Sequence, residues 1–354
     1  MSARPLAVIS IRTQFENVGD ALIVRELLRL IAARMRLVVD ISHCPRHFTD
    51  QLDLSSGDIE VVRRWGWPTI YARIFMERIA GSRVFHFRVP GGRVGEITLS
   101  TLQRQKVLAA LDRICQSVGV RICQVGVSYS GLGPRYAAAL RRRASAMHSP
   151  SVRDNLSFTR AQAMRIPVKG IVPDLAFNLF TDEKAASTER GRIALAFRVD
   201  RRAGDARQVE AFVTRLLDAH PEWSTVVVVS QVRRDDAFQQ WLAQTLRKRH
   251  GLSVSFVPCL TIDQALAAYD GCEVVFSNRL HSLLMAASRG VTPVAVVSDA
   301  ADDKIRGVFQ DLGAEGNLFS MAQTPTKLPS VLKTETTAIW RERIHVHFDE
   351  FLIN

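Results

Sequence analysis

A group of polar side chains follows one apolar run in the last third of the chain. Ser277, Asn278, Arg279 and His281 come directly after a predicted strand and open a predicted helix of small residues. This spacing puts Arg279 and His281 at a helix N-terminus, where N–H groups without partners and the helix dipole favour an anion. We interpret the group as an anion-binding site with a proton donor; a capped helix with a chance histidine is the alternative.

Arg198 stands at the end of another apolar run, Ile193–Phe197. In an α/β domain, an arginine at the carboxyl edge of a strand points into the ligand cleft, and its planar guanidinium suits a phosphate or a carboxylate. The alternative is an ordinary surface arginine, which is the commoner fate of this residue type.

Two glycine-containing segments follow strands nearer the N-terminus. Asn17, Gly19 and Asp20 come after the first apolar run, where Gly19 permits a tight strand-to-helix turn. Asp20 either caps the helix or faces a substrate. Gly91 and Gly92 end a later strand, and adjacent glycines let a backbone approach a ligand closely.

Familiar motifs for other chemistries are missing from the sequence. It has no phosphate-binding P-loop, no G-x-G-x-x-G after the first strand, no G-x-S-x-G and no H-E-x-x-H. Asp299, Asp302 and Asp303 with Lys304 offer metal ligands, but carboxylates on a polar loop are more often solvated. We therefore assign no metal.

These candidates depend on an alternation of short β-branched runs with longer amphipathic stretches, which predicts an α/β fold with parallel sheets and crossover helices. Helices are predicted over Ala21–Arg36 and from Thr334 to Asn354. The predicted strands are Leu6–Ile11, Leu37–Ile41, Val84–Val89, Ile122–Val127, Val168–Val172, Ile193–Phe197, Thr225–Ser230, Val254–Val257, Val274–Ser277 and Val294–Val297.

The length of 354 residues fits two domains. The polar segment Thr181–Arg192 separates the two series of strands and has no apolar period. We therefore expect an N-terminal domain over residues 1–185, a second domain over 186–333, and a helix over 334–354 that packs back on the N-terminal domain. Two α/β domains of this kind bind a ligand at the carboxyl ends of their strands.

Composition narrows the class of protein. With 47% hydrophobic and 23% charged residues, the chain is of ordinary globular type. No apolar run is long enough for a membrane span, and the first is too short for a signal peptide, so we expect a cytoplasmic protein. The net charge of +12 favours phosphates, nucleic acid or anionic lipid as partners without choosing among them.

Taken in order, short segments of the chain resemble the polysaccharide pyruvyl transferase family over nearly the whole length. The fold of that family is similar to the GT-B glycosyltransferase fold, which implies two Rossmann-like domains facing each other across a cleft. Arg93 departs from the family pattern where a third glycine is common, and Gly126–Ser130 is looser than usual. The matching segments are Asn17–Asp20, Gly91–Gly92, Gly131–Pro134, Val152–Ser157, Pro173–Phe177, Ala196–Arg198, Ser277–His281 and Gly290–Pro293.

The resemblance implies a pyruvyltransferase. Such an enzyme moves the enolpyruvyl-derived group of phosphoenolpyruvate onto hydroxyls of a sugar in a cell-surface glycan, such as an exopolysaccharide, or its precursor; it forms a pyruvate ketal and releases phosphate. His281 is then the acid that protonates C3, and Asp20 the base on the acceptor side. No cofactor is implied. The expected substrate-binding residues are Arg198, Arg279, Ser277, Asn278, Asn17, Gly19, Gly91 and Gly92.

Two other functions remain as alternatives. A GT-B nucleotide-sugar glycosyltransferase is the nearest, although no glutamate lies between Glu273 and Glu315 to supply the glutamate pair that many retaining members use. A non-catalytic protein that binds nucleic acid or another anion is the second. For nucleic acid, its basic residues should be interleaved with aromatic ones, and Arg141–Arg143 has none nearby.

The segment Arg63–Ile79 combines Trp65, Trp67 and Tyr71 with four arginines. Amphipathic aromatic rings among cations are typical of surfaces that contact anionic lipid headgroups. We expect peripheral contact of this segment with the inner face of the membrane, where a lipid-linked acceptor would lie. A lid over the cleft or a core helix is the alternative, and it is the commoner structure for such a segment.

Overall fold

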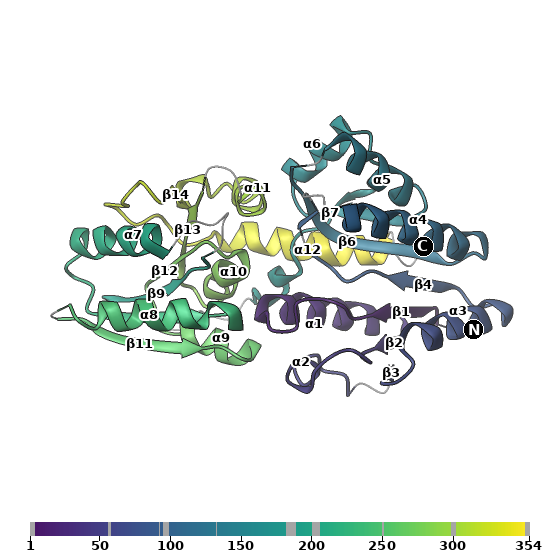
Figure 1. The fold of residues 1–354 in the computed structure, drawn as a ribbon, viewed down its shortest axis with the longest axis horizontal. Helices are drawn as coiled ribbons and strands as arrows, with labels where there is room; N and C mark the ends of the chain where they lie inside the picture. Colours follow the sequence, from purple (N-terminus) through teal and green to yellow (C-terminus); the bar gives the residue numbers. More distant parts are fainter. Residues whose placement is uncertain are drawn as a thin grey trace. The chain divides into compact units, whose positions relative to one another are not determined.

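The computed structural model describes residues 4–55, 58–91, 93–94, 99–131, 133–181, 189–199, 206–249, 251–298 and 302–350. The chain divides into two compact units (Figure 1). The first contains Met1–Phe15, Asp20–Leu175 and the segment that begins at Trp340, and the second contains Glu16–Gly19 and Ala176–Ile339. In the described ranges no helix is long and apolar enough to cross a membrane.

The first unit is built on a parallel sheet with the strand order β3-β2-β1-β4-β6-β7-β8, and β5 pairs with β6. β1 lies in the middle, so that Val8 pairs with Val38 on one side and with His86 on the other. The strands are β1 (Leu6–Ser10), β2 (Arg36–Asp40), β3 (Ile59–Val62), β4 (Val84–Phe87), β5 (Arg93–Val94), β6 (Arg121–Tyr129), β7 (Ser149–Val152) and β8 (Gly170–Ile171).

Helices cover this sheet because its central strands, such as β1 and β4, are buried at successive positions and therefore on both faces. Leu6 and Val8 of β1 share one core cluster with Ile70 and Ile74 of α3 and with Cys115 of α4. The helices of the unit are α1 (Val18–Ala32), α2 (Arg46–Thr49), α3 (Gly66–Ile79), α4 (Leu99–Ser117), α5 (Pro134–Ala144), α6 (Asn155–Ala163) and most of α12 (Thr334–Glu350).

The second unit has a six-stranded parallel sheet in the order β11-β10-β9-β12-β13-β14. Leu195 and Phe197 pack with Phe212 of α7 and Leu242 of α8 in one buried cluster. The strands are β9 (Arg192–Ala196), β10 (Thr225–Ser230), β11 (Ser253–Pro258), β12 (Val274–Ser277), β13 (Thr292–Val297) and β14 (Leu318–Ser320), and the helices are α7 (Ala206–Ala219), α8 (Asp236–Leu246), α9 (Ile262–Tyr269), α10 (Leu280–Ser288) and α11 (Asp303–Asp311). Three short 3₁₀ helices complete the described elements: η1 (Leu175–Leu179), η2 (Arg233–Asp235) and η3 (Glu315–Asn317).

The structure confirms the predicted α/β class, since every predicted strand overlaps an observed one. The predicted ends of the first helix were wrong: α1 begins at Val18, and it ends at Ala32 because Arg36 already pairs with Leu6 in the sheet. The predicted domain boundary at 185/186 falls among residues outside the described ranges, whereas the two units part between Leu175 and Ala176.

α12 packs against the first unit from Trp340 onward. Arg34 donates to Asp349 at 2.6 Å, and the ring of Phe348 stacks on Phe87. His347 lies 3.5 Å from the hydroxyl of Ser149. From Trp340 onward, α12 is therefore part of the core of the first unit.

Candidate functional site

The sheet of the second unit has a topological switch point between β9 and β12. From β9 the chain continues through β10 to β11 on one side, and β12 leads through β13 to β14 on the other. In open α/β sheets, ligands bind at such a point, outside the carboxyl ends of the strands. Arg198 lies two residues beyond the end of β9, and Asn278 directly follows β12. The two sequence motifs thus meet at the switch point.

Ser277 and Asn278 fasten the two strand ends to each other. The backbone N–H of Arg198 donates to Oδ1 of Asn278 at 2.8 Å, and Nδ2 of Asn278 donates to the carbonyl of Arg198 at 2.9 Å. The hydroxyl of Ser277 donates to the carbonyl of Ala196 at 2.5 Å and accepts from the N–H of Arg279 at 3.0 Å. Both side chains are buried, so these bonds position the backbone of Arg198 and Arg279.

Each arginine of the site is paired with a buried carboxylate. Nη2 of Arg198 lies 3.0 Å from Oδ1 of Asp302, and Nη2 of Arg279 is paired with Oδ2 of Asp235. The arginine side chains are 16% and 12% exposed. Because a guanidinium has five donors in a rigid fork, an ion pair at one edge fixes the direction in which the rest of the group points.

Sequence reasoning missed these two carboxylates. Asp302 had been considered with Asp299 and Asp303 as a metal ligand, but its oxygens accept from Arg198 and from the N–H of Ser298, the latter at 2.9 Å. Asp299 lies outside the described residues. In the part of the chain that the structure describes, no group of three His, Cys, Asp or Glu side chains is arranged to bind a metal.

Gly19 and His281, 262 positions apart in the sequence, are in contact in the second unit. A Cβ atom added to Gly19 would lie 2.6 Å from Cγ and 2.7 Å from Cβ of His281, and closer still to Nδ1. The ring therefore occupies the space that any side chain at position 19 would need. His281 lies in the first turn of α10, and Gly19 in the first turn of α1.

The segment that contains Gly19 is fastened to the end of β10. Val18 donates its N–H to the carbonyl of Gln231 at 3.1 Å, and Asn17 forms an isolated antiparallel bridge with Val232. The side-chain oxygen of Asn17 accepts from the N–H of Gly19 at 3.0 Å, which caps the start of α1. Asn17 thereby fixes the turn that brings Gly19 to His281.

Asp20 belongs to the first unit, at the switch point between β1 and β4 of that sheet. Its Oδ2 accepts from the hydroxyl of Thr13 and, at 3.2 Å, from the N–H of Gln14. The carboxylate thus closes the loop after β1. The sequence left open whether Asp20 is a cap or faces a substrate, and these bonds give it a structural role beside any chemical one.

Gly91 adopts a φ of +72°, a conformation that favours glycine, at the end of the segment after β4. An added Cβ would lie 2.6 Å from Cδ1 of Ile23 and 3.0 Å from Nη2 of Arg153. Gly91 is therefore required for close packing against Arg153. Gly92, the other predicted glycine, lies outside the described residues.

Arg153 was missed as a candidate, although its segment was among those that suggested the family. It is buried, and its Nη1 lies 2.8 Å from Oδ2 of Asp174, a residue of the next matching segment. The neighbouring Asp154 caps α6 by accepting from the N–H of Ser157 at 2.7 Å. These family segments therefore converge at the carboxyl ends of β7 and β8.

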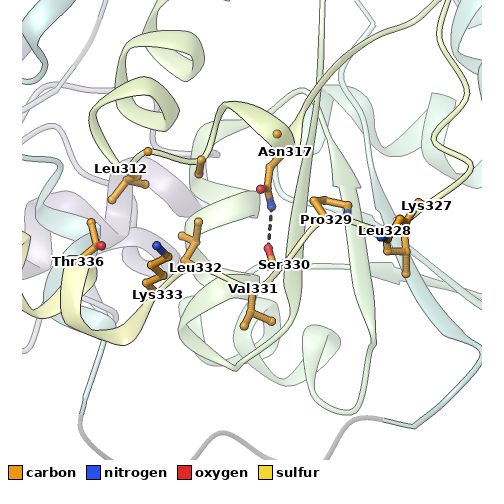
Figure 2. A pocket seen from close by; sticks show the side chains of 13 residues that line it. Leu312, Asn317, Lys327, Leu328, Pro329, Ser330, Val331, Leu332, Lys333 and Thr336 are labelled. Carbon is orange, nitrogen blue, oxygen red and sulfur yellow. Dashed lines mark hydrogen bonds between the residues drawn. The ribbon is translucent and has the colours of Figure 1, made fainter.

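A cavity of about 490 Å³ in the second unit lies away from these residues. It opens beside the end of α11, where Nδ2 of Asn317 donates to the carbonyl of Ser330 (Figure 2). The same nitrogen donates to the carbonyl of Pro293, near the start of β13. Lys327 and Lys333 are among its lining residues. The start of β13 is the opposite end of the strand from the switch-point residues, so this cavity contains none of the predicted site residues.

Solved structures with the same fold cover nearly the whole chain. HepE of Anabaena in complex with UDP and glucose is 13% identical, with 98% of this chain and 95% of that chain covered and a TM-score of 0.54. A putative UDP-N-acetylglucosamine 2-epimerase from Listeria monocytogenes is 12% identical, with 97% of this chain and 91% of that chain covered and a TM-score of 0.54. A glycosyltransferase from Rickettsia africae is 10% identical, with 98% of this chain and 94% of that chain covered and a TM-score of 0.53. At these identities the likeness shows the fold alone, and it confirms two Rossmann-like domains of the GT-B type.

Among curated proteins, none matches the chain. The sequence profile of one protein family matches the chain. The match extends from Asn17, before the first turn of α1, to Asp299, beyond β13. It therefore includes both of the motifs that meet at His281, and also Arg198 and Arg153. With residues 17–299 matched, which is well over half of its length, the chain belongs to the polysaccharide pyruvyl transferase family.

Proposed function

We propose that this protein transfers the enolpyruvyl-derived group of phosphoenolpyruvate to two hydroxyls of a sugar in a glycan or glycan precursor, and so forms a pyruvate ketal. Membership of the family supports a transferase that acts in polysaccharide modification. The observation that supports the donor is the pair Arg198 and Arg279 at one switch point, with His281 two residues beyond Arg279.

Phosphoenolpyruvate has two anionic ends, a phosphate and a carboxylate. Two guanidinium groups suit such a molecule, since each forms charge-assisted hydrogen bonds in a fixed plane. Asp302 and Asp235 hold the two arginines in place before a ligand arrives, which reduces the entropy lost on binding. In this proposal, Ser277 and Asn278 act by positioning the arginine backbone.

The chemistry requires a proton at C3 and a cation at C2. His281 donates its proton to C3, which becomes the methyl group, and the oxocarbenium at C2 is attacked by the first hydroxyl oxygen. The C2–O bond to phosphate then breaks, with the electron pair leaving on phosphate, and the second hydroxyl oxygen takes its place. Each hydroxyl loses its proton to a base. A histidine is suited to the first step because imidazolium is a common general acid in enzymes.

Asp20 is the proposed base for the acceptor hydroxyl, since it lies in the first turn of α1, at the switch point of the first unit's sheet. Gly91 and Asn17 act on the acceptor side by shaping the backbone. Proton transfers to and from these side chains, together with the exchange of C–O bonds at C2 of the donor, account for the reaction. We therefore assign no metal or organic cofactor.

The proposal is tested on the glycan itself. Surface glycan is isolated from cells with and without the gene for this protein and is analysed by mass spectrometry. We expect a sugar with the mass increment of a pyruvate ketal in the first sample and its loss in the second. A gene-dependent loss of a whole sugar residue would instead identify a glycosyltransferase, like the similar protein from Rickettsia africae.

A further inference from the structure

Large apolar side chains are exposed mainly on two helices of the first unit. Of the twelve that are exposed in the described part of the chain, seven belong to α3, α4 or the residue before α3. Trp65 and Ile79 are the most exposed, at 81% and 83%. We call this surface the α3–α4 face; its apolar residues are Trp65, Phe75, Met76, Ile79, Val107, Leu111 and Ile114.

The two helices lie on the same side of the sheet. Ile74 of α3 and Cys115 of α4 pack in one core cluster with β1. Nε of Arg78, near the end of α3, donates to the carbonyl of Val118, just after α4, at 2.8 Å. Their outward residues therefore contribute to a common surface.

Unlike an ordinary surface helix, α4 has its acidic residue buried and three large apolar residues exposed. Its one acidic residue, Asp112, is buried and is paired with Arg88 and, at 3.2 Å, with Arg143. At the spacing i, i+4, i+7, the residues Val107, Leu111 and Ile114 face outward instead. α4 thus has one apolar stripe against the core and a second one exposed. An exposed apolar stripe of this kind indicates a surface that a lipid layer or another molecule covers.

Basic side chains predominate around the apolar stripe. A groove of about 460 Å³ between α4 and α5 is lined by leucine and alanine side chains and by four basic residues, which are Lys106, Arg113, Arg135 and Arg142. α3, α4 and α5 contain only two acidic residues, Glu77 and Asp112, and both are paired with arginines. A second cavity, of about 580 Å³, lies beside Trp65 and is lined by Arg63 and Arg64.

Trp65 has a backbone conformation that such a residue adopts rarely, with a φ of +63°. This conformation leads into α3 with the indole pointing away from the core. Among the tryptophan and phenylalanine side chains that the structure describes, the most exposed one thus lies beside two arginines in the sequence. An amphipathic ring with cations around it is typical of the boundary between water and lipid headgroups.

We propose that the α3–α4 face docks on a membrane surface that contains anionic phospholipid. The apolar residues enter the headgroup region, and the basic residues contact lipid phosphates. A second copy of the chain is a poor occupant, because the two basic faces would repel each other. Nucleic acid would suit the charges but would leave the aliphatic side chains Val107, Leu111, Ile114 and Ile79 without a partner.

The test is sedimentation of the full-length protein with phosphatidylcholine vesicles that contain or lack phosphatidylglycerol. We expect sedimentation with the anionic vesicles at low salt and at least tenfold weaker partitioning into neutral vesicles or at high salt, because salt screens charges near the headgroups. This readout needs no donor or acceptor substrate, so its outcome is independent of the proposed function.

Two sets of substitutions on exposed residues test the face without disturbing the core. The first combines Val107→Ser, Leu111→Ser and Ile114→Ser, and the second combines Lys106→Gln, Arg113→Gln and Arg142→Gln. Each should lower partitioning into anionic vesicles at least tenfold. The matched control replaces three exposed apolar residues of the second unit, Trp241→Ser, Leu260→Ser and Val331→Ser, and should bind as the wild type does.

The assignment is wrong if the wild type stays in the supernatant, or if both sets of substitutions bind vesicles as strongly as the control. It is also wrong if the same substitutions abolish dimerisation in size-exclusion chromatography, or RNA binding in a gel shift, while the wild type binds no vesicles. Those outcomes would assign the α3–α4 face to a second copy of the chain or to nucleic acid.

Discussion

At the scale of residues, the site depends on carboxylates that are distant in sequence from the arginines they hold. The positions of Arg198, Arg279 and His281 beside strand ends could be predicted, because each stands just after an apolar run and the end of a strand is a local feature. Asp302 and Asp235 could not, since they lie 104 and 44 positions from their partners. Only the strand order brings them together.

We predict that Arg198→Ala and Arg279→Ala each weaken phosphoenolpyruvate binding about tenfold to a hundredfold, the loss expected for one charge-assisted contact. Isothermal titration calorimetry measures it. Arg215→Ala, on α7 of the same unit, is the control and should leave the affinity unchanged.

Removing one arginine also leaves a buried carboxylate without its partner, which destabilises a protein by about 3–5 kcal/mol. The double substitutions Arg198→Ala with Asp302→Ala and Arg279→Ala with Asp235→Ala separate this effect from binding. If the double variants fold normally and bind phosphoenolpyruvate as the wild type does, the arginines have no part in donor binding.

A second prediction concerns the contact of Gly19 with His281. Gly19→Ala places a methyl group where the imidazole lies, and forced overpacking of this kind costs about 1–3 kcal/mol. In a His281→Gly background, which removes both the ring and the Cβ atom that the added methyl group would meet, the space is open, so the same change should cost almost nothing. Urea unfolding of the four proteins in this double-mutant cycle measures the coupling, and a coupling near zero would show that the two residues do not touch.

At the scale of elements, apolar runs predict strands well when the strand is buried on both faces. β10, with the sequence Thr-Val-Val-Val-Val-Ser, was found with its observed ends. β7, with Ser-Pro-Ser-Val, was missed although all four residues are buried, because its polar groups are satisfied by tertiary contacts such as the bond from Gly126 to Ser151. Composition alone predicts a turn for such a sequence.

α12 provides a prediction about pH. Burial lowers the pKa of His347 from 6.5 to about 4, and burial together with Arg88 and Arg143 lowers that of His86. A histidine with a lowered pKa in the folded state contributes its stability above pH 6.5, and this stability is lost as the pH falls toward the folded value. We expect about 2 kcal/mol less stability from His347 at about pH 5 than at neutral pH.

Urea unfolding at the two pH values measures this difference. His347→Leu should reduce the acid-induced loss by about 2 kcal/mol, whereas His43→Gln, at an exposed position, should not change it. If the wild type and His347→Leu lose the same stability in acid, the pKa of His347 is not lowered by folding, and the prediction is wrong.

At the scale of the whole molecule, the two units are discontinuous in sequence. Glu16–Gly19 groups with the second unit, and the segment from Trp340 groups with the first. Sequence patterns predicted the number of α/β domains, because each has its own series of strands. They did not predict that Glu16–Gly19 groups with the second unit. This grouping depends on hydrogen bonds such as that from Val18 to Gln231, more than two hundred positions away.

The most direct test of the central claim is a donor experiment with purified protein and a glycan acceptor. Phosphoenolpyruvate and UDP-sugars are supplied in separate reactions, and release of phosphate or UDP is measured together with the mass of the product. We predict phosphate release with a pyruvate ketal on the acceptor, and a fall of about a hundredfold in turnover for His281→Gln, as expected on loss of a general acid. Transfer of a sugar from a UDP-sugar, with no product from phosphoenolpyruvate, would contradict the claim.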